Sequence, residues 1–385
     1  MNTKEREWLL GMANTKLMTD WLVILSQPPR LSSDNPGMHP ATPSYRQLLE
    51  GVSRSFGLSI RLLPPALQTP VGLAYLLART TDTVADASAV PTPRRLALLD
   101  SLRHAIDTPQ DHPQMGLALQ DFARQVADRH EQRLLHHGQA LLHALDTLPA
   151  VDQAVIRQVL CAILEGQRWD LQALDGPQHG AKTCADIERY TWQVAGSVGE
   201  FWTRMCELHL SDWQTVPPTQ TAQLLHWGAR YGQGLQRLNI LRDAGRDLQA
   251  GRCYFPAEEL HPLGLDSAQL CQAAQHGDMA VLERLRPLLA AWLHTTQEQL
   301  HDGLRYSLAL QGRRLRLASA LPCLIGIRTL ALLRQAGPQA LLTHVKLPRR
   351  EVQKLLLRLL VWGVSDRQLQ GCWAQAAPAP ARIQP

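Results

Sequence analysis

The sequence predicts an all-α protein built as one large helical domain. Apolar residues recur at helical spacing along most of the chain, in the segments 114–147, 151–174, 186–210, 219–249, 267–312 and 315–336. Strand signals are nearly absent, because stretches that alternate apolar and polar residues are rare and no Asn-Gly or Asp-Gly hairpin joins two of them. Hydrophobic residues make up 45% of the 385 residues and charged residues 19%, which is enough apolar material for a sizeable core.

The two ends of the chain differ in composition from the middle. Residues 8–25 have the pattern of a short helix, which is either a docking appendage or the result of a start codon placed too early. Residues 27–43 are rich in Pro, Ser and Asn and are typical of a linker. We therefore divide the chain into an N-terminal extension and linker over 1–43, a helical domain over 44–370 and a flexible tail over 371–385.

Proline and glycine clusters divide the helical domain into its elements. Breaks are expected at Pro64-Pro65, Pro91-Thr92-Pro93, 107–113, 175–180 and Pro217-Pro218. The connections are of ordinary length for a compact domain. No repeat of fixed period is present, so the helices are expected to form one bundle.

Composition argues against several classes of protein. The chain contains no run of about 18 or more uncharged apolar residues, so the sequence predicts no membrane-spanning helix. Glu5 and Glu7 argue against a secretory signal. We expect a cytoplasmic protein, with peripheral contact at the inner face of the membrane left open. The seven cysteines form no C-x-x-C pair and the fifteen histidines no H-E-x-x-H motif, so neither a disulfide framework nor a zinc site is expected. The 34 arginines and 5 lysines are spread along the chain, which does not support nucleic-acid binding.

The strongest chemical signal is two pairs of aspartates, each with i, i+4 spacing. Asp82 and Asp86 close the apolar run 71–78, and Asp243 and Asp247 close a second helical segment. Residues four apart lie on one face of a helix, so each pair projects two carboxylates in one direction. Two adjacent carboxylates repel each other unless a cation or a proton intervenes. Magnesium suits such a pair, because it takes one or two carboxylates and bridges to substrate phosphates.

The neighbours of each pair favour a site over a solvated helix face, which is the commoner explanation for a single pair. The first pair belongs to a set spaced 4, 3 and 4 on one helical face: Tyr75, Arg79, Asp82 and Asp86. The second pair belongs to a set spaced 3, 4 and 4 on one face: Gln236, Asn239, Asp243 and Asp247. A purely structural helix has little reason to align so many polar groups beside apolar turns.

Four motifs of this chain resemble the squalene/phytoene synthase family, the head-to-head prenyl-diphosphate synthases. They are S-R-S-F at 53–56, A-Y-L-L-A-R-T-T-D-T-V-A-D at 74–86, Y-T-W-Q-V-A-G-S-V-G at 190–199 and L-N-I-L-R-D-A-G-R-D-L-Q-A-G-R-C-Y-F-P at 238–256. The resemblance extends in order over about 45–335 and is far more specific than either aspartate pair. The segment 321–332 looks more like squalene synthases, in particular bacterial ones, than like phytoene synthases. The resemblance implies the isoprenoid synthase fold, a single helical bundle with a central active-site cavity.

The resemblance also implies roles for the matching residues. Binding of Mg²⁺, and through it of the substrate diphosphates, is implied for Asp82, Asp86, Asn239, Asp243 and Asp247. Contact with substrate is implied for Arg79, Gln236, Asn239, Arg252 and Tyr254, and for a mobile flap formed by Ser53, Arg54, Ser55 and Phe56. Tyr75 would lie near the reacting centre. The expected catalytic set is Tyr75, Arg79, Asp82, Asp86, Asp243 and Asp247.

Three further features concern the shape and charge of the expected site. Arg246 lies between the aspartates of the second pair, where the family often has an acidic or other residue, so it could compete for Asp243 or Asp247 or contact phosphate. The glycines of 196–199 and 232–234 are expected to permit close helix packing or to make room for an isoprenoid chain. The side chains that could line this cavity are Val71, Leu73, Leu76, Val194, Val198, Leu235 and Leu238.

The implied activity is that of a squalene synthase. Two farnesyl diphosphates would be condensed head to head through presqualene diphosphate, with Mg²⁺ as cofactor and with NADPH when the product is squalene. The alternatives are a phytoene, dehydrosqualene or hydroxysqualene synthase of the same family, or a synthase-like assembly factor without catalysis. A non-catalytic protein is expected to have lost some of these aspartates, whereas all four are present in this sequence. The chain length of the donor, the reductive step and the oligomeric state stay open.

Overall fold

The structure is a computed structural model, which describes residues 45–52, 60, 63–174, 180–217, 221–343, 345–362 and 364–377. The expected extension and linker over 1–43 and the flap residues Ser53, Arg54, Ser55 and Phe56 lie outside these described residues. Within them the prediction of an all-α protein is confirmed, since no strand is present and the only bridge joins Gln214 and Leu310.

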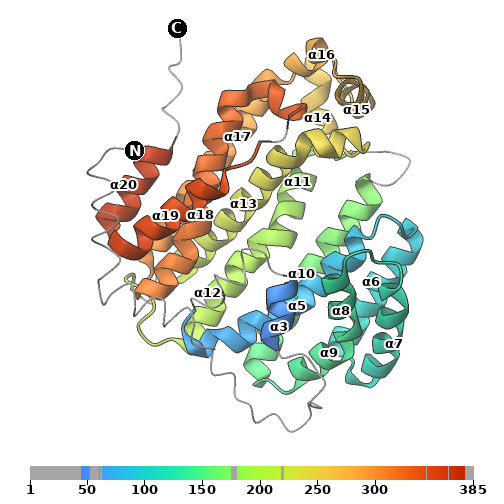
Figure 1. The fold of residues 1–385 in the computed structure, drawn as a ribbon, viewed down its shortest axis with the longest axis vertical. Helices are drawn as coiled ribbons and strands as arrows, with labels where there is room; N and C mark the ends of the chain where they lie inside the picture. The colour runs from blue at the N-terminus through green and yellow to red at the C-terminus, as the bar shows by residue number, and fades with distance from the viewer. Residues whose placement is uncertain are drawn as a thin grey trace.

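The described residues form a bundle of α-helices of very different lengths (Figure 1). The first part of the chain contains α3 (Tyr45–Val52), α5 (Pro65–Asp86), α6 (Thr92–Asp107), α7 (His112–Ala123), α8 (Arg129–His136), α9 (Gly138–Asp146) and α10 (Ala150–Leu174). The middle part contains α11 (Cys184–Thr191), the π-helical turn η3 (Trp192–Gly196), α12 (Ser197–His209) and α13 (Thr221–Gln249). The last part contains α14 (Ala257–Leu260), α15 (Ser267–His276), α16 (Met279–Glu283), α17 (Arg286–Ala309), α18 (Arg313–Ala336), α19 (Arg349–Trp362) and α20 (Asp366–Ala376).

Helix α13 is the central element of the bundle. Figure 1 shows it between α12 on one side and α17 and α18 on the other, and it packs against all three. Its buried residues lie all around its circumference, as expected for a helix inside a core. Apolar clusters fill the space between α5, α6, α10 and α12, between α13 and α14–α17, and between α13, α17, α18 and α20. The residues of α13 are therefore held in place from every side.

Several expected helices are interrupted in the structure. The periodic segment 114–147 forms three helices, because the chain turns after Ala123 and Asp128 caps α8 by accepting hydrogen bonds from the amides of His130 and Glu131. The segment 267–312 is also divided, and Gly277 ends α15 at a φ of 72°, a left-handed conformation that favours glycine. Apolar periodicity continues across these breaks because consecutive short helices turn their apolar sides to the same core.

The boundary of the tail at 370 is wrong. Helix α20 continues to Ala376, because Leu369, Cys372 and Ala376 recur at helical spacing and are buried. Ser365 and Gln368 form a capping box at its start. The remaining tail residues, 378–385, lie outside the described part of the chain.

One described segment is long and apolar enough to cross a bilayer, although the sequence predicts no such span. It comprises residues 313–341, and 67% of its most apolar window is buried inside the protein. Its helix α18 packs on α17, α13 and α20. Such burial is typical of a core helix, so length and hydropathy alone do not assign this segment to a membrane.

Candidate active site

The first aspartate pair projects from the end of α5 toward α8 and α10. Asp82 accepts a hydrogen bond of 2.6 Å from the side-chain amide of Gln167 on α10. Arg79 lies one turn earlier, with its guanidinium 3.7 Å from Asp82 and hydrogen-bonded at 2.5 Å to Glu131 on α8. Asp86 has no side-chain hydrogen bond or ion pair in the described part of the chain. One carboxylate of the pair is therefore anchored and the other is available.

The second pair on α13 shows the same division. Arg242 binds Asp243 through two hydrogen bonds, of 3.1 Å from Nε and 2.5 Å from Nη2. Asp247 has no side-chain partner among the described residues. One turn before Asp243, the amide of Asn239 lies 3.5 Å from Gln236, whose own amide donates to the hydroxyl of Tyr190 at 3.4 Å.

Asp170 on α10 links the two pairs. It accepts hydrogen bonds from Arg252 at 2.5 Å and from Tyr254 at 2.6 Å, and Arg252 also donates to Tyr254 at 3.0 Å. The charges of Asp170 and Arg252 both act on the pKa of Asp86 and on that of Asp247. The ends of α5 and α13 therefore face a common group of charges.

The pKa values of three aspartates are raised in this site. The pKa of Asp82 is raised to about 6, first by desolvation between the helices and then by the charge of Asp86, although 46% of its side chain is accessible. Desolvation also raises the pKa of Asp86. It raises the pKa of Asp247 to about 6, although the positive charge of Arg252 lowers it. Carboxylates that are crowded and poorly hydrated are stabilised in their charged form by a bound cation.

The donor set fits a magnesium ion that takes part of its ligands from water or phosphate. The described residues contain no group of three or more His, Cys, Asp or Glu side chains placed to hold a metal together. Magnesium needs no such cage, since it binds one or two carboxylates and takes its other ligands from water and phosphate. Asp86 and Asp247 are the carboxylates best placed to supply them, with Asp82 and Asp243 beside them.

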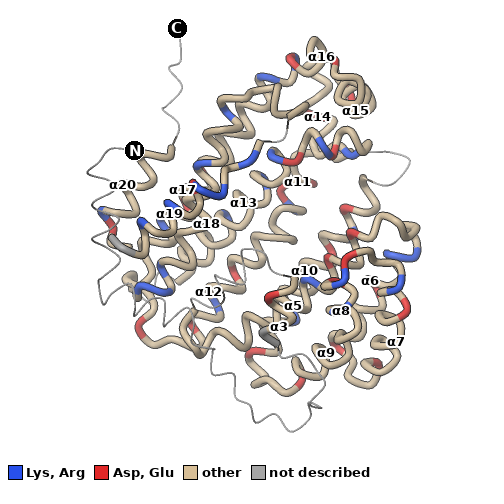
Figure 2. Tube along the Cα trace, in the orientation of Figure 1, with Lys and Arg blue, Asp and Glu red and all other residues tan. Residues whose placement is uncertain are grey.

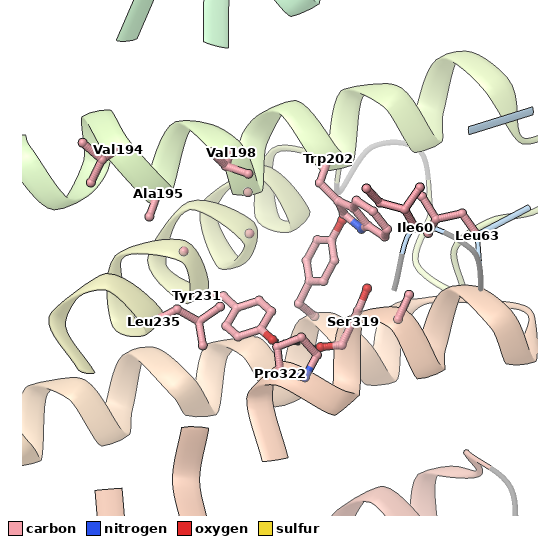
Figure 3. Close-up of a pocket in the computed structure, with 15 residues that line it drawn as sticks. Ile60, Leu63, Val194, Ala195, Val198, Trp202, Tyr231, Leu235, Ser319 and Pro322 are labelled. Atoms are coloured by element: carbon pink, nitrogen blue, oxygen red, sulfur yellow. Dashed lines mark hydrogen bonds between the residues drawn. The ribbon is translucent and has the colours of Figure 1, made fainter. Parts of the chain in front are cut away.

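An apolar cavity of about 220 Å³ lies beside helix α13 (Figure 3). It lies between η3, α12, α13 and α18, and its labelled lining residues are Ile60, Leu63, Val194, Ala195, Val198, Trp202, Tyr231, Leu235, Ser319 and Pro322. Leu235 lies eight residues before Asp243, about 12 Å along the axis of α13. One face of α13 therefore runs from apolar lining to carboxylates.

Glycines bring α12 and η3 into direct contact with α13 beside this cavity. A methyl group on Gly199 would lie 1.9 Å from the carbonyl oxygen of Gly228, and one on Gly232 would lie 2.1 Å from that of Ala195. The expected role in close helix packing is therefore supported, and both glycines also line the cavity. The π-helical turn lies at the same contact, and such turns occur frequently at functional sites.

The other expected residues lie in three kinds of surroundings. Tyr75 is half-buried with its hydroxyl 3.4 Å from the carbonyl oxygen of Val52, and burial raises its pKa. The side chain of Arg246 is exposed and makes no hydrogen bond or ion pair in the described part of the chain, so Arg242 and not Arg246 pairs with Asp243. The charge of Arg246 still acts on Asp247, whose pKa it lowers. Among the expected cavity residues, three line the cavity: Val194, Val198 and Leu235. The other four are buried in core clusters: Val71, Leu73, Leu76 and Leu238.

Sequence reasoning missed Gln167, Asp170 and Tyr190. Gln167 and Asp170 are three residues apart on one face of α10, the same kind of signal that identified the aspartate pairs. Tyr190 opens the motif at 190–199, and its ring packs 5.0 Å from Trp169 and 5.8 Å from Tyr254. The three rings pack together beside the charged site, because the hydroxyl of Tyr254 is hydrogen-bonded to Asp170 and Arg252.

Comparison with known proteins gives consistent matches. The family described as squalene/phytoene synthase matches residues 49–351. Squalene synthase ERG9 of Saccharomyces cerevisiae is 28% identical over 212 residues, which cover 55% of this chain and 45% of that protein. The 15-cis-phytoene synthase of Synechocystis sp. is 28% identical over 225 residues, which cover 56% and 55%. This chain thus spans about half the length of these curated relatives.

The fold has a counterpart among solved structures. The complex of TcSQS with the ligand BPH1237 matches with a TM-score of 0.66 at 21% identity, over 89% of this chain and 92% of that one. The likeness shows that the two chains share the all-α fold, as expected from the sequence motifs.

Proposed function

This chain belongs to the squalene/phytoene synthase family, and on that basis we propose that it condenses two farnesyl diphosphates head to head to squalene. One observation carries the proposal. The two aspartate pairs lie around the ion pair of Asp170 and Arg252, near the C-terminal end of α13. An earlier part of α13 lines an apolar cavity. An isoprenoid diphosphate has the matching chemistry, with a charged head and an apolar chain.

The residues of the site would bind the diphosphate heads. Asp82, Asp86, Asn239, Asp243 and Asp247 would hold Mg²⁺, which neutralises the charge of a departing diphosphate. Arg79, Arg242 and Arg252 would bind diphosphate oxygens, because a guanidinium pairs with phosphate through two parallel hydrogen bonds. Gln236 and Tyr254 would orient these groups through the contacts that they make in the structure. Arg252 is held by Asp170 and so is preorganised for this task.

The reaction would proceed in two halves. In the first, the bond between C1 and oxygen of one substrate breaks, the electron pair leaves with diphosphate, and the double bond of the second substrate attacks C1. Loss of a proton then closes the cyclopropane ring of presqualene diphosphate. In the second half the remaining diphosphate departs, the cation rearranges, and hydride from NADPH gives squalene. The faces of Tyr190, Tyr254 and Trp169 would stabilise the cations, and the buried cavity would exclude water.

Sister activities of the family are the main alternative. The same first half leads to phytoene from longer donors, or to dehydrosqualene or hydroxysqualene when no hydride is transferred. The similarity to both a squalene and a phytoene synthase is consistent with each of them. A non-catalytic assembly factor is disfavoured, because all four aspartates stand and their neighbourhood is polar and ordered.

Peripheral contact with a membrane would suit an enzyme that releases an oily product from the cytoplasm. Helix α19 is the described element best suited to it. Its Leu357 is 42% exposed, and Lys354 and Arg358 lie beside it at the surface. Figure 2 shows basic residues along α18 and α19 on this side of the molecule. A basic helix with an exposed apolar side chain beside its positive charges is typical of contact with anionic lipid.

A product assay tests the proposed function. The purified protein is incubated with Mg²⁺ and radiolabelled farnesyl diphosphate, with and without NADPH. We expect squalene only when NADPH is present and no turnover when Mg²⁺ is removed by a chelator. Dehydrosqualene or hydroxysqualene under both conditions would assign the chain to a sister activity. No turnover with farnesyl or geranylgeranyl diphosphate would support the assembly factor instead.

A further inference from the structure

The apolar cavity has two distinct ends (Figure 3). Val194 and Leu235 line the end next to the charged site, since they follow Tyr190 by four residues and precede Gln236 by one. At the other end Figure 3 shows the indole of Trp202 beside Ile60 and Leu63. A chain whose diphosphate is bound at the aspartates would enter between Val194 and Leu235 and extend toward Trp202.

We propose that Trp202 ends the path of the isoprenoid chain and restricts this enzyme to farnesyl-length donors. The proposal rests on the proposed function, since it names the substrate of that same site. Trp202 is the largest side chain at its end of the cavity, so its removal would lengthen the path more than that of any neighbour there. The cavity accommodates one chain, and the chain of the second substrate must follow a different path.

The volume of the cavity suits two isoprene units. A dry cavity of about 150 Å³ binds a benzene ring, so by proportion 220 Å³ has room for about nine carbon atoms, close to two such units. A farnesyl chain presents two units beyond the one that carries the reacting carbon, and a geranylgeranyl chain presents three. The third unit would meet Trp202.

The other aromatic walls of the cavity are anchored by hydrogen bonds. The hydroxyl of Tyr231 donates to the carbonyl oxygen of Ser319 at 2.9 Å, and the ring lies against Gly303, where a methyl group would be only 2.4 Å from it. Tyr306 is hydrogen-bonded to Thr203 at 2.9 Å. These side chains fix the width of the cavity.

Trp202 is held differently. Its indole N–H has no hydrogen-bond partner among the described residues, so it is positioned by packing alone. Replacing Trp202 by an apolar residue therefore lengthens the cavity without breaking a hydrogen bond.

The test is the chain-length selectivity of a Trp202→Leu variant. We measure kcat/KM for farnesyl and geranylgeranyl diphosphate and compare their ratio with that of the unmodified enzyme. Trp227→Leu is the matched control, because Trp227 is partly buried against the same core cluster but does not line the cavity. We expect the ratio to shift toward the longer donor by about tenfold or more in Trp202→Leu, since even one methylene group changes selectivity about tenfold. Trp227→Leu should keep the original ratio.

A ratio within about twofold of the original in folded Trp202→Leu, or an equal shift in Trp227→Leu, would overturn the proposal. If Trp202→Leu does not fold, Trp202→Phe provides a smaller extension and should shift the ratio in the same direction.

If the unmodified enzyme makes no product at all, the proposed function fails, and the limit on chain length is tested by measuring binding instead. The unreactive farnesyl and geranylgeranyl thiolodiphosphates are then titrated calorimetrically with Mg²⁺ present. Loss of the preference for the shorter analogue in Trp202→Leu would support the length limit, and an unchanged preference would refute it.

Discussion

The carboxylate of Asp170 connects the two aspartate pairs, so its replacement by asparagine is the most informative single change. Asp170→Asn keeps one acceptor oxygen for Tyr254 but places an amide NH₂ opposite the guanidinium of Arg252, which now lies 2.5 Å from a carboxylate oxygen. Both side chains of this ion pair are largely buried, with 16% and 25% of their surface exposed. The variant therefore loses a charge-assisted hydrogen bond that water replaces only in part.

The expected cost can be worked out from that contact. A hydrogen bond to a charged group contributes about 1.5–3 kcal/mol to the free energy of unfolding. The unfolding entropy is about 2.1 cal/mol/K per residue, so for a chain of 385 residues each kcal/mol lowers the Tm by about 1.2 °C, and Asp170→Asn should lower it by about 2–4 °C. Asp107→Asn is the matched control, because Asp107 pairs with Arg103 at an exposed position, where such a pair contributes about 0–1 kcal/mol.

The pH dependence separates a role in the site from a purely structural role. The charge of Asp170 raises the pKa of Asp86 and of Asp247, so its loss lowers both. These carboxylates must be ionised to bind Mg²⁺, and the acid limb of the pH–rate profile should lie near pH 6 and move to lower pH in Asp170→Asn. An unchanged Tm together with an acid limb at its original pH would refute the reasoning.

Three further outcomes are expected. The pKa values of Asp82 and Asp247 are raised to about 6 in the folded protein, so the folded state binds more protons than the unfolded state between about pH 4 and 6. The Tm without metal should therefore fall as the pH rises through this range, and Mg²⁺ should restore it above pH 6. A Tm that rises over the same range would contradict the raised pKa values of these two aspartates. Gly232→Ala places a methyl group 2.1 Å from a backbone oxygen of η3 and should lower the free energy of unfolding, measured with urea, by about 1–3 kcal/mol. Gly371→Ala on α20 is the control, because a methyl group there has no atom within 4 Å, and it should leave this free energy unchanged or raise it slightly. Arg246→Ala removes no hydrogen bond or ion pair of a side chain with the described residues, and only the effect of its exposed charge on the pKa of Asp247 is lost. We expect kcat/KM above pH 7 to stay within about twofold in the same product assay, and a larger loss there would contradict this minor role.

Local spacing along the sequence determined the helical class and the faces of its polar residues. The i, i+4 spacing of Asp82 and Asp86, and of Asp243 and Asp247, fixes their shared direction wherever a helix forms, because the geometry of an α-helix is the same in every fold. For the glycines at 199 and 232 the sequence likewise indicated two roles, close helix packing or room for an isoprenoid chain, because a glycine inside a helix leaves space where a side chain would lie.

Only the tertiary structure decided which of these faces meet. The meeting of Asp170 with Arg252, 82 residues apart, depends on how α10 packs beside the segment after α13, and no local spacing records it. The same holds for the choice of Arg242 over Arg246 as partner of Asp243, and for the cavity, where Val194 and Leu235 line the space while Val71 and Leu76 are core. An apolar residue on a helix satisfies the same sequence pattern in a core or beside a cavity, because both remove it from water, and the packing of neighbouring helices alone determines where space is left.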